Sequence, residues 1–151
     1  MEVTVESLEE MLAFGRSFGA QLRGGEVIEL VGDVGTGKTT FVKGLADGLA
    51  VTDVVQSPTF TISRIYEARD GLRLCHYDFY RLSEAGIMRD ELSETITDPE
   101  VVIALEWDET VQDLLPVERT IQIRIAYTGD TSRKLSITLP AAVDYLQKET
   151  V

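Results

Sequence analysis

Residues 26–49 read EVIELVGDVGTGKTTFVKGLADGL and contain the strongest structural signal of the chain. Glu26–Val31 is a short run rich in β-branched residues that predicts a strand, and Thr40–Leu49 carries its apolar residues on one helical face. Between them, Gly32–Thr39 satisfies the pattern G-x-x-x-x-G-K-[ST]. That pattern is informative when a strand precedes it and a helix follows, and both are predicted here. The stretch therefore predicts an α/β fold organised around a P-loop.

The residue types of this loop explain how it would hold phosphate. Glycines at positions 32, 35 and 37 let the backbone curl with its N–H groups turned toward an anion. The helix that follows presents its positive end to the same anion. Lys38 supplies a cation for the β- and γ-phosphates, and Thr39 supplies a hydroxyl for Mg²⁺. These residues predict a site for a nucleoside triphosphate and Mg²⁺.

A P-loop also needs an acid at the end of a second strand, and two residues compete for that role. Glu106 follows Val101–Leu105, a continuously apolar run that is typical of a buried strand. Asp78 follows the more mixed run Leu72–Tyr77, which is compatible with a half-exposed hairpin strand. Both acids are expected in the active site, one close to Mg²⁺ and the other acting through water. The sequence leaves open which acid is closer to the metal, and a plain surface or salt-bridged role remains the alternative for each.

Three other features near these motifs have weaker interpretations. Ser57–Phe60 follows the P-loop helix at a distance where a loop can sense the γ-phosphate, with Thr59 as the sensing hydroxyl. The spacing supports equally well a purely structural X-Pro loop that leads into a strand. His76, the only histidine, is predicted to be structural. Cys75 is predicted to be a small buried apolar residue rather than a nucleophile.

The remaining patterns complete one α/β domain over residues 1–151, with a mixed parallel and antiparallel sheet flanked by helices. Apolar spacings of three and four residues predict a helix over Val5–Leu22. Two pairs of strand-like runs are joined by short turns and predict antiparallel hairpins. These are Thr59–Ala68 with Leu72–Tyr80, and Ile121–Tyr127 with Lys134–Leu139, before a short closing helix over Ala141–Leu146.

Composition narrows the classes of function. The 151 residues include 14 Lys and Arg against 26 Asp and Glu, so the net charge is −12. Binding to nucleic acid or to an anionic membrane without help is disfavoured, because such binding needs clustered cations. One cysteine excludes an intramolecular disulfide. The acidic start of the chain has no signal-peptide pattern, and no apolar run approaches a membrane span, so we expect a cytoplasmic protein.

Four motifs taken together resemble the TsaE family of small P-loop ATPases. They are GDVGTGKTT at 32–40, SPTFT at 57–61, HYDFYRL at 76–82 and the pair Glu106-Trp107. Their order and spacing match, and the likeness runs from about Ser7 to Leu139. Two departures stand out: Met11 occupies a position where many members have threonine, and Ser83–Thr97 is a looser match to the usual loop.

The resemblance implies ATP and Mg²⁺ as cofactors and assigns roles to individual residues. It implies that Lys38, Asp78 and Glu106 are catalytic, and that Thr39 and Glu106 bind the metal. Thr59 would belong to a switch-like loop, Trp107 would lie beside the nucleotide or a partner, and Arg133 would reach the nucleotide. The implied nucleotide-binding set is Gly32, Asp33, Val34, Gly35, Thr36, Gly37, Lys38, Thr39, Thr40, Thr59, Trp107 and Arg133.

The implied function is that of an accessory ATPase. Members of the family act with the TsaD and TsaB proteins in forming threonylcarbamoyladenosine at adenosine 37 of tRNA, and TsaD transfers the group. The ATPase would meet tRNA only indirectly and would not act at a membrane. A small-molecule P-loop kinase is the alternative, although the scattered arginines between Thr59 and Trp107 form no obvious lid. A second alternative is a scaffold protein that binds a nucleotide without useful hydrolysis of it. A GTPase is disfavoured because the chain has no asparagine for an Asn-Lys-x-Asp loop.

Overall fold

The computed structural model describes residues 1–55, 63–78, 86–106 and 109–147, and all structural statements concern these residues. The strands are β1 (Glu2–Val5), β2 (Val27–Val31), β3 (Ser63–Glu67), β4 (Arg73–Asp78), β5 (Val101–Glu106), β6 (Thr120–Tyr127) and β7 (Arg133–Thr138). The α-helices are α1 (Leu8–Ala20), α2 (Lys38–Gly48) and α3 (Gly86–Thr95). Short 3₁₀ helices are η1 (Arg69–Gly71), η2 (Glu109–Leu114) and η3 (Ala141–Gln147).

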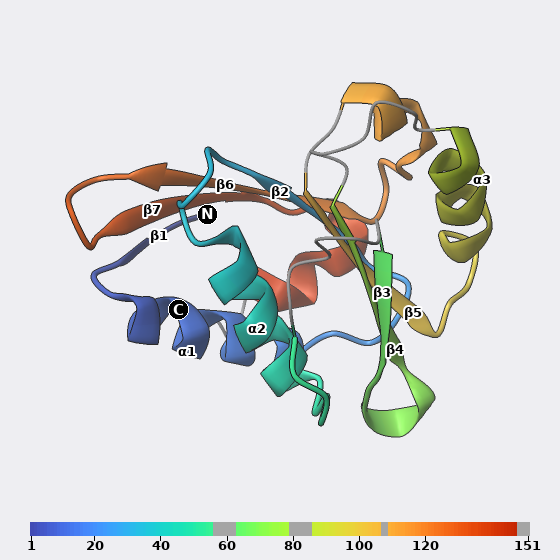
Figure 1. Ribbon diagram of the computed structural model, residues 1–151, viewed down its shortest axis with the longest axis horizontal. Coiled ribbons are helices and arrows are strands. Elements are labelled where there is room, and N and C mark those ends of the chain that lie inside the picture. The colour runs from blue at the N-terminus through green and yellow to red at the C-terminus, as the bar shows by residue number, and fades with distance from the viewer. Residues whose placement is uncertain (56–62, 79–85, 107–108, 148–151) are drawn as a thin grey trace.

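The described strands form a single mixed sheet in the order β1-β7-β6-β2-β5-β4-β3 (Figure 1). Strand β2 lies at its centre and runs parallel to β5 and β6, and β4 runs parallel to β5. The outer pairs β3/β4, β6/β7 and β1/β7 are antiparallel. The predicted α/β fold with a mixed sheet and flanking helices is confirmed, as are both predicted hairpins.

Helices cover the two faces of the sheet differently. Helices α1 and α2 pack together on one face, and α3 and η2 lie on the other (Figure 1). Alternation along β2 follows this division, because Ile28 and Leu30 belong to the core under α1 and α2 whereas Val27 belongs to the core under α3. The same alternation assigns every strand residue near the P-loop to one face or the other.

Glycines allow α1 and α2 to approach closely. A Cβ atom added at Gly19 would lie 2.2 Å from the Leu45 carbonyl oxygen, and one at Gly48 would lie 2.2 Å from the Arg16 carbonyl oxygen. Gly15 and Gly44 face similarly short contacts with the opposite backbone. Since no larger residue fits without moving a helix, these glycines hold α2, and hence the end of the P-loop, against α1.

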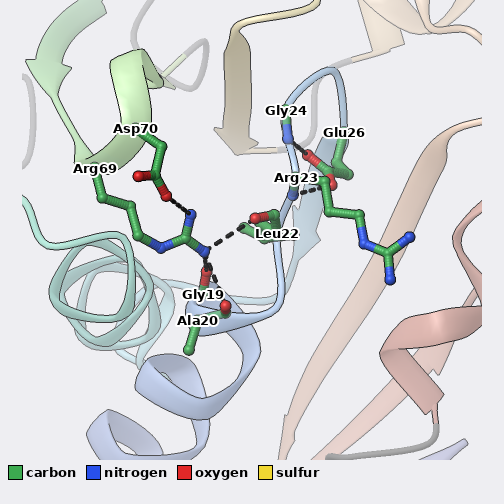
Figure 2. Close-up of polar contacts among 8 residues, drawn as sticks. All are labelled: Gly19, Ala20, Leu22, Arg23, Gly24, Glu26, Arg69 and Asp70. Atoms are coloured by element: carbon green, nitrogen blue, oxygen red, sulfur yellow. Dashed lines mark hydrogen bonds and ion pairs between the residues drawn. The ribbon is translucent and has the colours of Figure 1, made fainter.

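Arg69 ties the β3–β4 hairpin to the end of α1. Figure 2 shows its Nη2 donating to the carbonyl oxygens of Gly19, Ala20 and Leu22 at 3.2, 2.8 and 3.0 Å. The last carbonyls of a helix have no partner within the helix, so a guanidinium that caps them is favourable. The contact joins segments that lie far apart in the sequence.

Replacing Arg69 by alanine is expected to lower the free energy of unfolding by about 1–3 kcal/mol, because it removes three hydrogen bonds from a charged guanidinium to backbone carbonyls. Urea denaturation measures the change. Arg16→Ala is the matched control, since Arg16 pairs with Asp47 at the surface, where such pairs contribute about 0–1 kcal/mol. Equal losses in the two variants would refute a capping role for Arg69.

The structure corrects several predicted boundaries. The helix predicted over Val5–Leu22 begins at Leu8, because Ser7 accepts a hydrogen bond from the Glu10 amide at 3.1 Å and caps it. Val5, the first residue of the predicted helix, instead ends β1, which pairs with β7. Helix α3 lies within Ser83–Thr97, a segment interpreted as a loop, and the predicted closing helix is the 3₁₀ helix η3.

Candidate functional site

The P-loop connects the centre of the sheet to α2. Strand β2 ends at Val31, the loop follows, and α2 begins at Lys38 rather than at the predicted Thr40. Gly35 and Gly37 have φ angles of +84° and +105°, which lie in the left-handed region that glycine adopts readily. No side chain caps the start of α2. The loop therefore leaves the amino end of the helix available to an anion.

Contacts within the loop set its shape. Lys38 Nζ donates to the Gly32 carbonyl oxygen at 2.8 Å, so its ammonium group lies across the mouth of the loop. The buried Thr36 donates its hydroxyl to the Asp33 carbonyl oxygen at 2.8 Å. The tip of the loop, at Asp33, Val34 and Gly35, is exposed. Thr39 and Thr40, at the start of α2, are half-buried.

The two candidate acids lie side by side. Asp78 ends β4 and Glu106 ends β5, and they are direct partners in the parallel register of these strands. Glu106 is also the partner of Leu30, two residues before the P-loop begins. Each acid is only 7% exposed. Alternation turns both toward the face of the sheet that α2 covers, so the ends of three parallel strands bring the loop and both acids to one edge.

The β6–β7 hairpin braces the P-loop from the other side. Arg133 Nε donates to the Thr36 carbonyl oxygen at 3.1 Å, and its guanidinium lies 4.2 Å from the centre of the Tyr127 ring. The Tyr127 hydroxyl donates to the Val34 carbonyl oxygen at 3.3 Å. A cavity of about 440 Å³ lies beside the loop, lined in part by Asp33, Arg124 and Tyr127. The sequence analysis did not predict a role for Tyr127, because its position before a tight turn was its only distinguishing feature.

Comparison with known proteins identifies the family. The family model described as "Threonylcarbamoyl adenosine biosynthesis protein TsaE" matches residues 5–135. The chain belongs to the TsaE family. Among curated TsaE proteins, it is 42% identical to that of Bacillus subtilis over 86% of this chain and 80% of the relative. It is also 42% identical to that of Aquifex aeolicus over 90% of this chain and 94% of the relative.

A solved structure supports the same assignment. The crystal structure of Bacillus subtilis YdiB superposes with a TM-score of 0.78 at 34% sequence identity, over 99% of this chain and 93% of that chain. The predicted resemblance to the TsaE family is thus confirmed. The structure places Lys38, Asp78 and Glu106 at one edge of the sheet and Arg133 against the P-loop. Thr59 and Trp107 lie outside the described residues.

His76 lies on β4 two residues before Asp78 and faces the same side of the sheet. Its ring is fully buried, and within the described part of the chain neither ring nitrogen has a hydrogen-bond partner. Burial lowers the pKa of His76 to about 4, while the nearby charge of Asp78 acts in the opposite direction. The neighbouring Cys75 is buried on the other face, where burial raises the pKa of its thiol to about 11. The burial of Cys75 agrees with the prediction. His76 is a neutral imidazole two residues before Asp78 on the same strand.

This buried imidazole is expected to make stability depend on pH. The unfolded chain binds a proton at His76 below a pKa near 6.5, whereas the folded chain does so only near 4. Stability is therefore full above pH 6.5 and falls as the pH decreases toward 4, by about 1 kcal/mol between about pH 7.5 and 5.5. Urea midpoints for the wild type and His76→Leu over this range measure it. The variant should lose less stability, and parallel losses would refute the assignment.

Proposed function

We propose that this chain binds ATP with Mg²⁺ and hydrolyses ATP as an accessory ATPase of threonylcarbamoyladenosine formation at adenosine 37 of tRNA. The observation that carries the proposal is the meeting of the P-loop with two buried acids at one edge of the sheet. Asp78 and Glu106 are neighbours in register, and Glu106 pairs with the strand that enters the loop. Membership of the TsaE family supplies the pathway.

The residues fit the groups that this function requires. The left-handed glycines Gly35 and Gly37 and the uncapped start of α2 form a backbone cradle suited to phosphate oxygens. Lys38 lies at the mouth of this cradle and would bind the β- and γ-phosphates. Thr39 and Glu106 would hold Mg²⁺, which neutralises phosphate charge when bound. Asp78 would orient the attacking water through a hydrogen bond.

The remaining site residues have supporting roles in this proposal. Arg133 holds the Thr36 carbonyl and stacks on Tyr127, so it would keep the loop curled around phosphate rather than act on it alone. Thr59 would contribute a hydroxyl that responds to the γ-phosphate, and Trp107 would lie beside the nucleotide or a partner. The backbone of Asp33, Val34 and Thr40 would complete the phosphate contacts.

The proposed partners are the TsaD and TsaB proteins, and tRNA would be met only through them. A net charge of −12 opposes direct binding of tRNA, because phosphate neutralisation supplies most non-specific affinity. Within the described part of the chain, each helix is too short or too polar to cross a bilayer. We place the reaction in the cytoplasm, where tRNA is modified.

Steady-state ATPase assays of the chain alone, with tRNA, and with TsaB and TsaD test this proposal. The chain alone is expected to turn over slowly, since the spacing of arginines in the sequence indicates no arginine finger, and such a group supplied by a partner contributes about 10³–10⁵ in rate. Stimulation by the partners but not by tRNA alone is the expected result. Full activity alone, stimulation by tRNA without the partners, or transfer of phosphate to a small acceptor would contradict it.

A further inference from the structure

A second cavity opens on the face of the sheet opposite α1 and α2. Its volume is about 430 Å³, and none of its lining residues belongs to the P-loop. Its floor is a row of neighbours in register, Glu29 on β2, Gln122 on β6 and Thr138 on β7. Leu115 and Leu139 supply apolar walls, and the side-chain amide of Gln112 on η2 lies at the edge. The cavity therefore combines hydrogen-bond acceptors on its floor with apolar side chains on its walls.

Glu29 is unusual for a buried acid. It is 3% exposed, and its single hydrogen bond among the described residues comes from Gln112 Nε2 at 2.5 Å. Its neighbours in the sheet, Leu105 and Gln122, carry no charge. Buried carboxylates are normally paired with a cation or saturated with donors, because desolvation is costly. The described residues supply Glu29 with neither.

Glu26, a buried acid directly before β2, is an example of a carboxylate with several hydrogen-bond donors. It accepts hydrogen bonds from the Arg23 and Gly24 amides at 2.6 and 2.8 Å, which Figure 2 shows. The Tyr145 hydroxyl donates to it as well, at 2.5 Å. The contrast between the two acids indicates that, among the described residues, Glu29 keeps room for a further donor.

The chemistry of the cavity indicates a flat cation on an apolar stem. Among the described residues, no lysine or arginine lines it, so no cation competes with an incoming one for the carboxylate. The Gln122 side chain already accepts a hydrogen bond from Arg124 Nε at 3.2 Å outside the cavity, which shows that it can serve a guanidinium. A guanidinium matches a carboxylate with a fork of N–H donors, and its methylene stem would lie on Leu115 and Leu139.

We propose that this cavity binds the arginine side chain of a partner protein. The chain carries a net charge of −12, which favours a basic partner surface, and the lone carboxylate of Glu29 supplies the specific recognition point. The cavity is of the size that suits one long side chain or a small ligand. Because it lies on the face away from α2, its occupancy can be tested without nucleotide and independently of ATP hydrolysis.

The experiment titrates the nucleotide-free protein with the capped peptide acetyl-Ala-Arg-Ala-amide and follows ¹⁵N NMR spectra. The side-chain amide of Gln112 and the backbone of Glu29 and Gln122 are expected to shift in a saturable way. The peptide with citrulline in place of arginine keeps the shape without the charge and should bind at least about tenfold more weakly. Equal binding of the citrulline peptide, tighter binding of a lysine peptide, or tenfold tighter binding of free agmatine would overturn the proposal.

Variants locate the interaction. Glu29→Gln keeps an acceptor for Gln112 and should weaken the arginine peptide at least about tenfold, whereas Glu9→Gln on the exposed start of α1 should not. Thr138→Lys at the exposed end of β7 places a competing cation over the floor and should abolish binding with Glu29 intact. This second variant keeps the test valid if Glu29→Gln fails to fold. Unchanged binding in either folded variant would refute the site.

Discussion

Lys38→Ala is expected to weaken ATP binding by about 10- to 150-fold, because it removes a charge-assisted contact to phosphate that contributes roughly 1.5–3 kcal/mol. In the structure, Lys38 Nζ donates to the Gly32 carbonyl oxygen at 2.8 Å, so the ammonium group is already held over the loop. Little side-chain freedom then remains to be lost when phosphate binds. Isothermal titration calorimetry with Mg²⁺ and ATP measures the change.

Lys43→Ala is the matched control for this experiment. Lys43 lies on the same helix but is exposed away from the loop, so its removal should leave ATP affinity nearly unchanged. Loss of the Lys38 contact to Gly32 could also loosen the loop, and melting temperatures of both variants separate this effect from binding. Equal ATP affinity in Lys38→Ala and the wild type would refute the phosphate site.

The second large effect is expected at the paired acids. Asp78→Asn and Glu106→Gln should each lower ATP hydrolysis by about 10²–10³-fold, because each removes a preorganised charge where metal and water would be placed. The amide replacements keep the size of the buried side chains, so the melting temperature should change little by comparison. Glu100→Gln, an exposed change before the opposite end of β5, is the control.

A titration with Mg²⁺ decides which acid is closer to the metal. If Glu106 holds the metal, Glu106→Gln raises the Mg²⁺ concentration needed for half-maximal rate, whereas Asp78→Asn lowers the rate at saturating Mg²⁺. The reverse pattern would exchange the two roles. If both variants melt early but keep their specific activity, the acids are structural and the proposed catalytic assignment fails.

Local patterns explain most of what could be predicted. The P-loop, its strand and its helix follow from adjacent residues, since glycine placement and helical periodicity act over a few positions. Both hairpins follow from alternation and tight turns. Helix α3 was missed because its buried Leu92 lies among the polar residues Arg89–Glu91 and Ser93–Thr95, which weaken the helical periodicity. Strand β1 was missed because only its pairing with β7 distinguishes it from the start of α1.

Residue type and short-range spacing were enough to predict the strand–loop–helix unit, the two acids as candidates and the net negative charge. That Asp78 and Glu106 are neighbours could be learned from the folded chain alone, since parallel register joins residues far apart in the sequence. The tertiary structure also brought Arg133 and Tyr127 onto the P-loop. Likewise, no local pattern predicts that Glu29 is buried beside Gln112 with no cation next to it among the described residues, because segments far apart in the chain surround it.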